Sequence, residues 1–221
     1  MKNTVRDFPP RYLVSILFII SVFAVTINFF IDLLYYSKGG LSGPRFLAVI
    51  KAIDISTVYG SFLLVLCAIT ALLAYPYRES ERGHLKSFWV SVAVTFLVLS
   101  LAKANSLFSS GFGFVRSIFE SREVPVLSFV FVIAVIVVLI ILSIWLSLHF
   151  PRRIRRLFVI AACIYISGAI VMEELSELAW HFYGPKTVVY PMVSSVEELL
   201  EMIGCIIFIH AVSLYRRSQP V

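Results

Sequence analysis

Charge is scarce in this chain. Asp, Glu, Lys and Arg make up only 14% of the 221 residues, whereas hydrophobic residues make up 60%. A water-soluble domain needs a far more polar surface, so this composition excludes an ordinary soluble protein. Apolar runs of about 20 residues, the length that crosses a bilayer as a helix, indicate an integral membrane protein instead.

Cysteine and histidine are also few. The three cysteines, Cys67, Cys163 and Cys205, all fall inside apolar segments. That placement excludes a disulfide framework in loops and predicts three small buried side chains. The four histidines are too scattered to favour a haem held between two of them. No A-x-A-type cleavage site follows the first apolar run, so we interpret it as a retained helix and not as a signal peptide.

Six apolar segments are long enough to cross a membrane as helices. They predict an all-α integral membrane fold, a bundle of six transmembrane helices that occupies residues 1–221 as one domain. Helices satisfy every backbone polar group internally, which the bilayer requires. The predicted segments are Tyr12–Tyr36, Phe46–Tyr75, Phe88–Ser110, Val124–Phe150, Leu157–Phe182 and Met192–Tyr215.

Basic residues gather at the ends and connections that share one side of this bundle. They are Lys2, Arg6, Arg11, Arg78, Arg82, Lys86, Arg152, Arg153, Arg155, Arg156, Arg216 and Arg217. The positive-inside rule therefore places both termini in the cytoplasm, in a bacterial-type inner membrane. The net charge of +6 reflects this topology and does not indicate nucleic acid as a partner. The densest run, "PRRIRR" at Arg152–Arg156, predicts contact with anionic lipid headgroups, and a specific lipid or protein site there stays open.

Polar residues of five segments fall at one depth. At a rise of about 1.5 Å per residue, counting outward from the cytoplasmic basic residues reaches the outer third of the bilayer at Asn28, Ser61, Lys103, Glu173 and Glu201. Asp32 and Asp54 fall somewhat further out. The fourth segment is apolar all round, so we expect it at the periphery.

Ionised groups inside a bilayer are costly and usually face a bundle interior or a water-filled cavity. Lys103 is the internal cation available to pair with Glu173, Glu174 or Glu201. One lysine leaves a surplus of negative charge, which needs protons, water or a bound cation.

Two Glu-Glu-x-x-Glu stretches, 173–177 and 197–201, lie where the fifth and sixth segments meet. The short connection predicts antiparallel neighbours, so the two acidic faces can meet. Carboxylate oxygens suit hard cations, and carboxylates that lie close together favour binding of a proton. We therefore predict an outward-facing site that binds or conducts a proton, a metal cation or a cationic small molecule. Its expected residues are Glu173, Glu174, Glu177, Glu201 and His181, with Lys103, Asn28, Ser61, Asp32 and Asp54 as counter-ion and polar layer.

Other interpretations stay open. The last two helices could protrude into water, with Glu177, Glu197 and Glu198 solvated and Ser194 or Ser195 as the N-cap of the last helix. The chain could also be an assembly subunit that docks onto itself or another membrane protein. A membrane metalloenzyme is the third alternative, although Glu177-x-x-x-His181 departs from the Glu-x-x-His spacing of di-iron bundles. We favour a non-enzymatic protein with no cofactor other than a bound cation.

The last segment, "VEELLEMIGCIIFIHAVSLY", resembles the closing helix of a group of bacterial multi-pass membrane proteins with a Glu-Glu-x-x-Glu-Met-x-Gly pattern. The second segment, "DISTVYGSFLLVLCAITALL", is similar to their second helix. The resemblance implies a multi-pass fold and supplies no activity. Those proteins carry acidic residues and histidine at the end of the third helix, where this chain has Lys103 and Asn105, so the resemblance does not extend to shared metal chemistry.

Overall fold

The computed structural model describes residues 11–38, 54–74, 83–108, 150–184 and 187–218. The regular structure in these ranges is entirely helical, which confirms the predicted all-α class there. The elements are α1 (Arg11–Ser37), α3 (Ile55–Leu73), α4 (Gly83–Phe108), α7 (Arg152–Ile166), η2 (Ser167–Met172), α8 (Glu173–Tyr183) and α9 (Val189–Ser218). The predicted helix 124–150 and its expected peripheral position lie outside the described residues, apart from Phe150.

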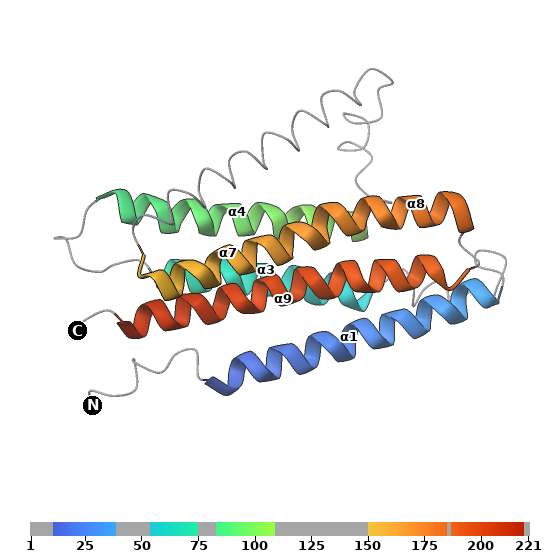
Figure 1. Ribbon diagram of the computed structural model, residues 1–221, viewed down its shortest axis with the longest axis horizontal. Helices are drawn as coiled ribbons and strands as arrows, with labels where there is room; N and C mark the ends of the chain where they lie inside the picture. The colour runs from blue at the N-terminus through green and yellow to red at the C-terminus, as the bar shows by residue number, and fades with distance from the viewer. Residues whose placement is uncertain (1–10, 39–53, 75–82, 109–149, 185–186, 219–221) are drawn as a thin grey trace, which may run out of the picture.

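Helix α9 is the element with the most helical neighbours in the described bundle. It packs against α1, α3, α7, η2 and α8, and α4 packs against α3. Figure 1 shows α1, α4 and the continuous α7–η2–α8 rod running in one direction, with α3 and α9 running in the other. The predicted antiparallel packing of the fifth and sixth segments is thereby confirmed. The starts of α1, α4 and α7 and the end of α9 lie together, at what we term the basic end because it holds Arg152–Arg156, Arg216 and Arg217.

Three described helices are long and apolar enough to cross a membrane: Tyr12–Ser37, Ile55–Leu73 and Arg152–Tyr183. Helix α4 contains a shorter apolar stretch, Phe88–Ala104. Large apolar side chains also face outward, as Phe23 (66% exposed) and Leu101 (70% exposed) do. Such surfaces are unfavourable in water and suit contact with lipid, so the described helices fit a membrane protein.

The buried residues of α1 recur every three or four positions, which places them on one helical face. They are Leu17, Ser21, Ala24, Val25, Asn28, Asp32 and Tyr35. Helix α1 packs against α9 and α3, and the Tyr59 hydroxyl of α3 donates a 3.0 Å hydrogen bond to the Leu17 carbonyl oxygen. The polar residues of α1 therefore lie inside the bundle.

An aromatic cluster joins α4, α7 and α9 near the basic end. Trp89 is fully buried, and its ring centroid lies 5.4 Å from that of Tyr215 and 5.8 Å from that of Phe150. Phe150 in turn lies 5.5 Å from Phe158. Aromatic pairs at such distances contribute about 0.5–1.5 kcal/mol each beyond burial. The cluster fixes the ends of three helices relative to one another.

Glycines allow α9 to approach α7 and η2 closely. A Cβ atom at Gly204 would lie 2.7 Å from the Cβ of Tyr165 and 2.9 Å from its backbone nitrogen. A Cβ atom at Gly168 would lie 2.9 Å from the carbonyl oxygen of Glu197. Only glycine leaves room for these contacts, which bring η2 against the acidic half of α9.

The cysteines divide into two groups. Cys67 and Cys205 are buried as predicted, and the Cys67 thiol donates a 3.5 Å hydrogen bond to the Cys205 carbonyl oxygen, from α3 to α9. Cys163 is exposed, so the prediction of a buried thiol was wrong at this position. At about 100° per residue it lies on the face of α7 opposite the buried Phe158 and Ala161.

Candidate acidic site

Lys103 of α4 forms an ion pair with Glu201 of α9. The two side chains are only 16% and 12% exposed, so the pair is largely shielded from solvent. Helix α3 packs against both α4 and α9, and the lysine stem runs past Gly60 of α3, where a Cβ atom would lie 2.9 Å from the Lys103 Cε. The missing side chain at Gly60 is what lets the ammonium group reach the far helix.

Two more carboxylates lie near this ion pair, and a third lies near one of these two. Glu197 and Glu198 of α9 both interact electrostatically with Lys103, and Glu197 also interacts with Glu201 and with Glu173 of α8. Glu198 and Glu201 are both buried. We term Glu173, Glu197, Glu198 and Glu201 with Lys103 the acidic cluster. One cation for four carboxylates leaves a strong surplus of negative charge.

The π-helical turn η2 determines which residues of α8 face the acidic cluster. It directly precedes Glu173, and Gly168 within it contacts the backbone of α9. A π turn adds a residue to the helical turn and so rotates the face that follows. After it, Ser176 is buried and donates a hydrogen bond to the Glu197 carboxylate. Such turns often occur at functional sites.

Tyr165 and Ser100 lie beside the acidic cluster. Tyr165 of α7 contacts Gly204 and interacts electrostatically with Glu201. The Ser100 hydroxyl, one turn before Lys103, donates a 3.0 Å hydrogen bond to the Ser61 carbonyl oxygen of α3. The hydroxyl of Ser61 itself is bonded within its helix, to the Thr57 carbonyl oxygen at 2.9 Å. Ser61 therefore contributes to helix packing next to Gly60.

The structure separates several predicted site residues from this cluster. Glu174 and His181 are exposed, and in the described part of the chain no polar contact joins either of them to Lys103. The His181 ring contacts Phe182 edge-on at 5.6 Å. The side chain of Glu177 lies outside the described residues. Glu173 is exposed as well, yet it faces Glu197 closely enough to interact with it.

The remaining members of the predicted polar layer have other surroundings. Asn28 (4% exposed) and Asp32 (3% exposed) lie on the buried face of α1. The Asn28 Oδ1 has no hydrogen-bond partner among the described residues. Asp54 is the N-cap of α3, where its carboxylate accepts hydrogen bonds from the Thr57 nitrogen at 3.1 Å and the Ser56 hydroxyl at 2.7 Å. Asp54 therefore has a local structural role at the end of its helix.

Glu197 and Glu198 are the members that sequence reasoning left out of the site. The alternative that they are solvated residues at a helix N-terminus is wrong for Glu198, which is buried. Helix α9 begins at Val189, so neither Ser194 nor Ser195 caps it. Pro191 lies in its first turn, which tolerates proline because the first backbone nitrogens of a helix have no intrahelical acceptor. This proline was the signal for the earlier start.

No three His, Cys, Asp or Glu side chains within the ranges described lie close enough together to hold a metal ion. The arrangement instead offers the Glu197 carboxylate close to those of both Glu173 and Glu201, beside one ammonium group. Paired carboxylates can share a proton or receive a single positive charge.

Comparison with known proteins identifies a family for this chain but does not indicate an activity. A family model described as "Domain of unknown function (DUF8692)" matches residues 13–215, almost the whole chain. No curated protein and no solved structure matches.

Proposed function

We propose, for a chain that belongs to the DUF8692 family of unknown function, that the acidic cluster binds a proton or a small cation within a membrane bundle of six helices. The observation that carries this proposal is the ratio of charges around Lys103. One ammonium group faces three glutamates of α9 directly, and Glu173 faces one of these. Two of the four carboxylates, those of Glu198 and Glu201, are buried.

The electrostatic cost of this arrangement supports a bound positive charge. Two like charges about 4 Å apart repel by about 4 kcal/mol at an effective dielectric constant near 20. The Lys103–Glu201 pair offsets one carboxylate only. Binding a proton between two of the others removes the repulsion without moving the backbone, and a monovalent cation at the same place does so too. Ser176 donates a hydrogen bond to the Glu197 carboxylate, and this bond can form whether a proton or a cation binds.

The proposed topology places both termini in the cytoplasm of a bacterial-type inner membrane, with the acidic cluster nearer the outer face. Support comes from the gathering of Arg152–Arg156, Arg216 and Arg217 at one end of the bundle. Basic residues at membrane boundaries mark the cytoplasmic side. Three described helices have the length and composition of spans, and the proposal extends the count to six from the apolar segments of the sequence.

Thermal unfolding of the purified protein in neutral detergent tests the binding site. We expect wild-type stability to increase as the pH falls from neutral, because a bound proton relieves repulsion among Glu173, Glu197 and Glu201 beside Lys103. A group that takes up a proton more readily in the folded state contributes stability that is present at low pH and is lost as the pH rises. Glu198→Gln and Glu197→Gln should each flatten this dependence, because they remove one negative charge permanently.

Glu174→Gln is the matched control. It removes the same charge from the neighbouring position of Glu173, on an exposed side chain outside the cluster. It should leave the wild-type dependence on pH unchanged. The same series repeated with sodium, potassium and tetramethylammonium salts at fixed ionic strength separates a proton site from a cation site. If the cluster variants and Glu174→Gln respond alike to pH and to every cation, the cluster is only a structural ion network.

A further inference from the structure

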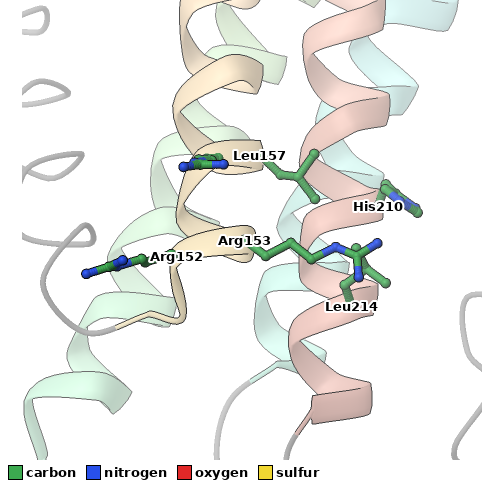
Figure 2. Close-up of a pocket in the computed structure, with 6 residues that line it drawn as sticks. Arg152, Arg153, Leu157, His210 and Leu214 are labelled. Atoms are coloured by element: carbon green, nitrogen blue, oxygen red, sulfur yellow. The ribbon is translucent and has the colours of Figure 1, made fainter.

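A pocket of about 500 Å³ opens between α7 and α9 at the basic end, away from the acidic cluster. Its lining consists of Arg152, Arg153, Arg156, Leu157, His210 and Leu214. In Figure 2, Arg153 and Leu157 extend from α7 toward α9, where His210 and Leu214 lie. Each of these two pairs is spaced four residues apart, so each forms one face of its helix. Two facing surfaces thus define the pocket.

Among the described residues, the lining carries positive charge and includes no carboxylate. Arg152, Arg153 and Arg156 are exposed, and no ion pair in the described ranges involves them. The charged groups that act on His210 from the elements around it are also basic, namely Arg153 and Arg217. Guanidinium groups stay protonated at every physiological pH, so an anion between α7 and α9 meets permanent positive charge from Arg153, which extends toward α9, whereas Arg152 extends away from it (Figure 2).

Two leucines make part of the pocket lining apolar. Leu157 and Leu214 add an apolar wall next to the guanidinium groups. One turn beyond Leu157 along α7, Ile160 (47% exposed) presents apolar surface outward. The pocket therefore continues into a surface suited to acyl chains, which a site for a freely soluble anion does not need.

We propose that this pocket binds the phosphate headgroup of an anionic phospholipid. Arginine binds phosphate through two parallel N–H···O hydrogen bonds, a geometry that lysine cannot reproduce. Arg153 and Arg156 bind the phosphate oxygens, and His210 donates a hydrogen bond from α9. The first methylene groups of the acyl chain pack on Leu157 and Leu214. A volume of about 500 Å³ lies within the range of pockets that hold small molecules. This proposal does not depend on the function proposed for the acidic cluster.

The test titrates the full-length protein, purified in neutral detergent, with three separate probes: short-chain phosphatidylglycerol, short-chain phosphatidylcholine and inorganic phosphate. The readout is the shift of the melting temperature. Phosphatidylglycerol should stabilise the wild type most. Arg153→Gln should require about tenfold more of it for the same shift, since a charged hydrogen-bonding pair is worth about one decade in affinity.

Arg216→Gln is the matched control, because Arg216 carries the same charge at the basic end and does not line the pocket. It should respond to phosphatidylglycerol as the wild type does. His210→Leu is a second pocket variant on the opposite helix, and it keeps the test valid if Arg153→Gln does not fold. Equal weakening by Arg153→Gln, His210→Leu and Arg216→Gln would overturn the pocket in favour of general attraction to anionic headgroups. An equal shift with inorganic phosphate alone would overturn the assignment to a lipid.

Discussion

Lys103 and Glu201 belong to helices that are separated by α3, and they meet because Gly60 of α3 has no side chain to block the lysine stem. The pair therefore ties α4 to α9 across a third helix. Among the described residues, this ion pair is the contact that brings α4 to the acidic cluster on α9.

Replacing Lys103 with methionine should destabilise the protein by about 3–5 kcal/mol, because the change leaves the Glu201 carboxylate buried without its cation. The free energy of unfolding in mixed micelles measures this loss. Lys38→Met, at an exposed lysine after α1, is the control and should change stability by no more than about 0.5 kcal/mol. The double variant with Glu201→Gln should recover part of the loss, since no buried charge remains. A Lys103→Met variant as stable as Lys38→Met would show that the pair contributes nothing.

Gly60 offers a second and independent test of the same geometry. A Cβ atom there would lie 2.9 Å from the Lys103 Cε, closer than van der Waals contact allows. We expect Gly60→Ala to cost about 1–3 kcal/mol, the usual range for overpacking, by displacing the lysine from Glu201.

The diagnostic measurement places Gly60→Ala in a Lys103→Ala background. Without the lysine stem there is no obstruction, so the alanine should stabilise α3 by about 0.5–1 kcal/mol through its better helix propensity. Gly60→Ala should therefore destabilise the wild-type protein and stabilise the Lys103→Ala variant. An unchanged cost in both backgrounds would mean that α3 meets a different obstacle at this position.

The described helices and the common depth of Lys103 and Glu201 could be predicted from the sequence. The length of the first apolar segment predicted a helix at Tyr12–Tyr36, and the observed helix is Arg11–Ser37. Counting residues from basic anchors gave one depth for Lys103 and Glu201, which the structure pairs. Both predictions rest on the fixed rise of a helix, which is independent of tertiary structure.

The composition of the candidate site was less predictable. Helical periodicity gives the face of a residue only if the helix is regular, and η2 interrupts the regularity directly before Glu173. The resulting rotation leaves Glu174 exposed and turns Ser176 toward Glu197. A π turn carries no strong sequence signal, because it depends on packing such as that of Gly168 on α9. Glu198 differs, because it lies three residues before Glu201 on the regular helix α9, and helical periodicity could have placed it on the same buried face.

Gly204 should be less tolerant of alanine than Gly60. A Cβ atom at Gly204 would meet the Tyr165 nitrogen at 2.9 Å and the Ala161 carbonyl oxygen at 3.0 Å. These are backbone atoms of α7, which cannot move aside as a lysine stem can. We expect Gly204→Ala to lower the unfolding free energy by about 3 kcal/mol, the upper end of the overpacking range, and to separate α7 from α9.

The ranking of the two glycine variants is the measurement that matters, because both add the same methyl group to a buried helical position. Unfolding of Gly60→Ala and Gly204→Ala in the same micelles compares them directly. If Gly60→Ala proves the more damaging, the close approach of α7 and α9 at Gly204 is relieved at little cost.

Asp54 tests whether the polar layer includes residues with purely structural roles. Its carboxylate caps α3 through the Thr57 nitrogen and the Ser56 hydroxyl, and its backbone adopts a left-handed conformation with φ of 37°. Asp54→Ala should cost about 1–2 kcal/mol, because it removes the cap and places a residue with a Cβ but no capping oxygen in that conformation. Asp54→Asn keeps a capping oxygen and tolerates the same φ, so it should lose only a fraction of this. Neither variant should alter the pH dependence that Glu198→Gln flattens. If Asp54→Asn flattens it equally, Asp54 belongs to the binding site and the helix cap is not its main role.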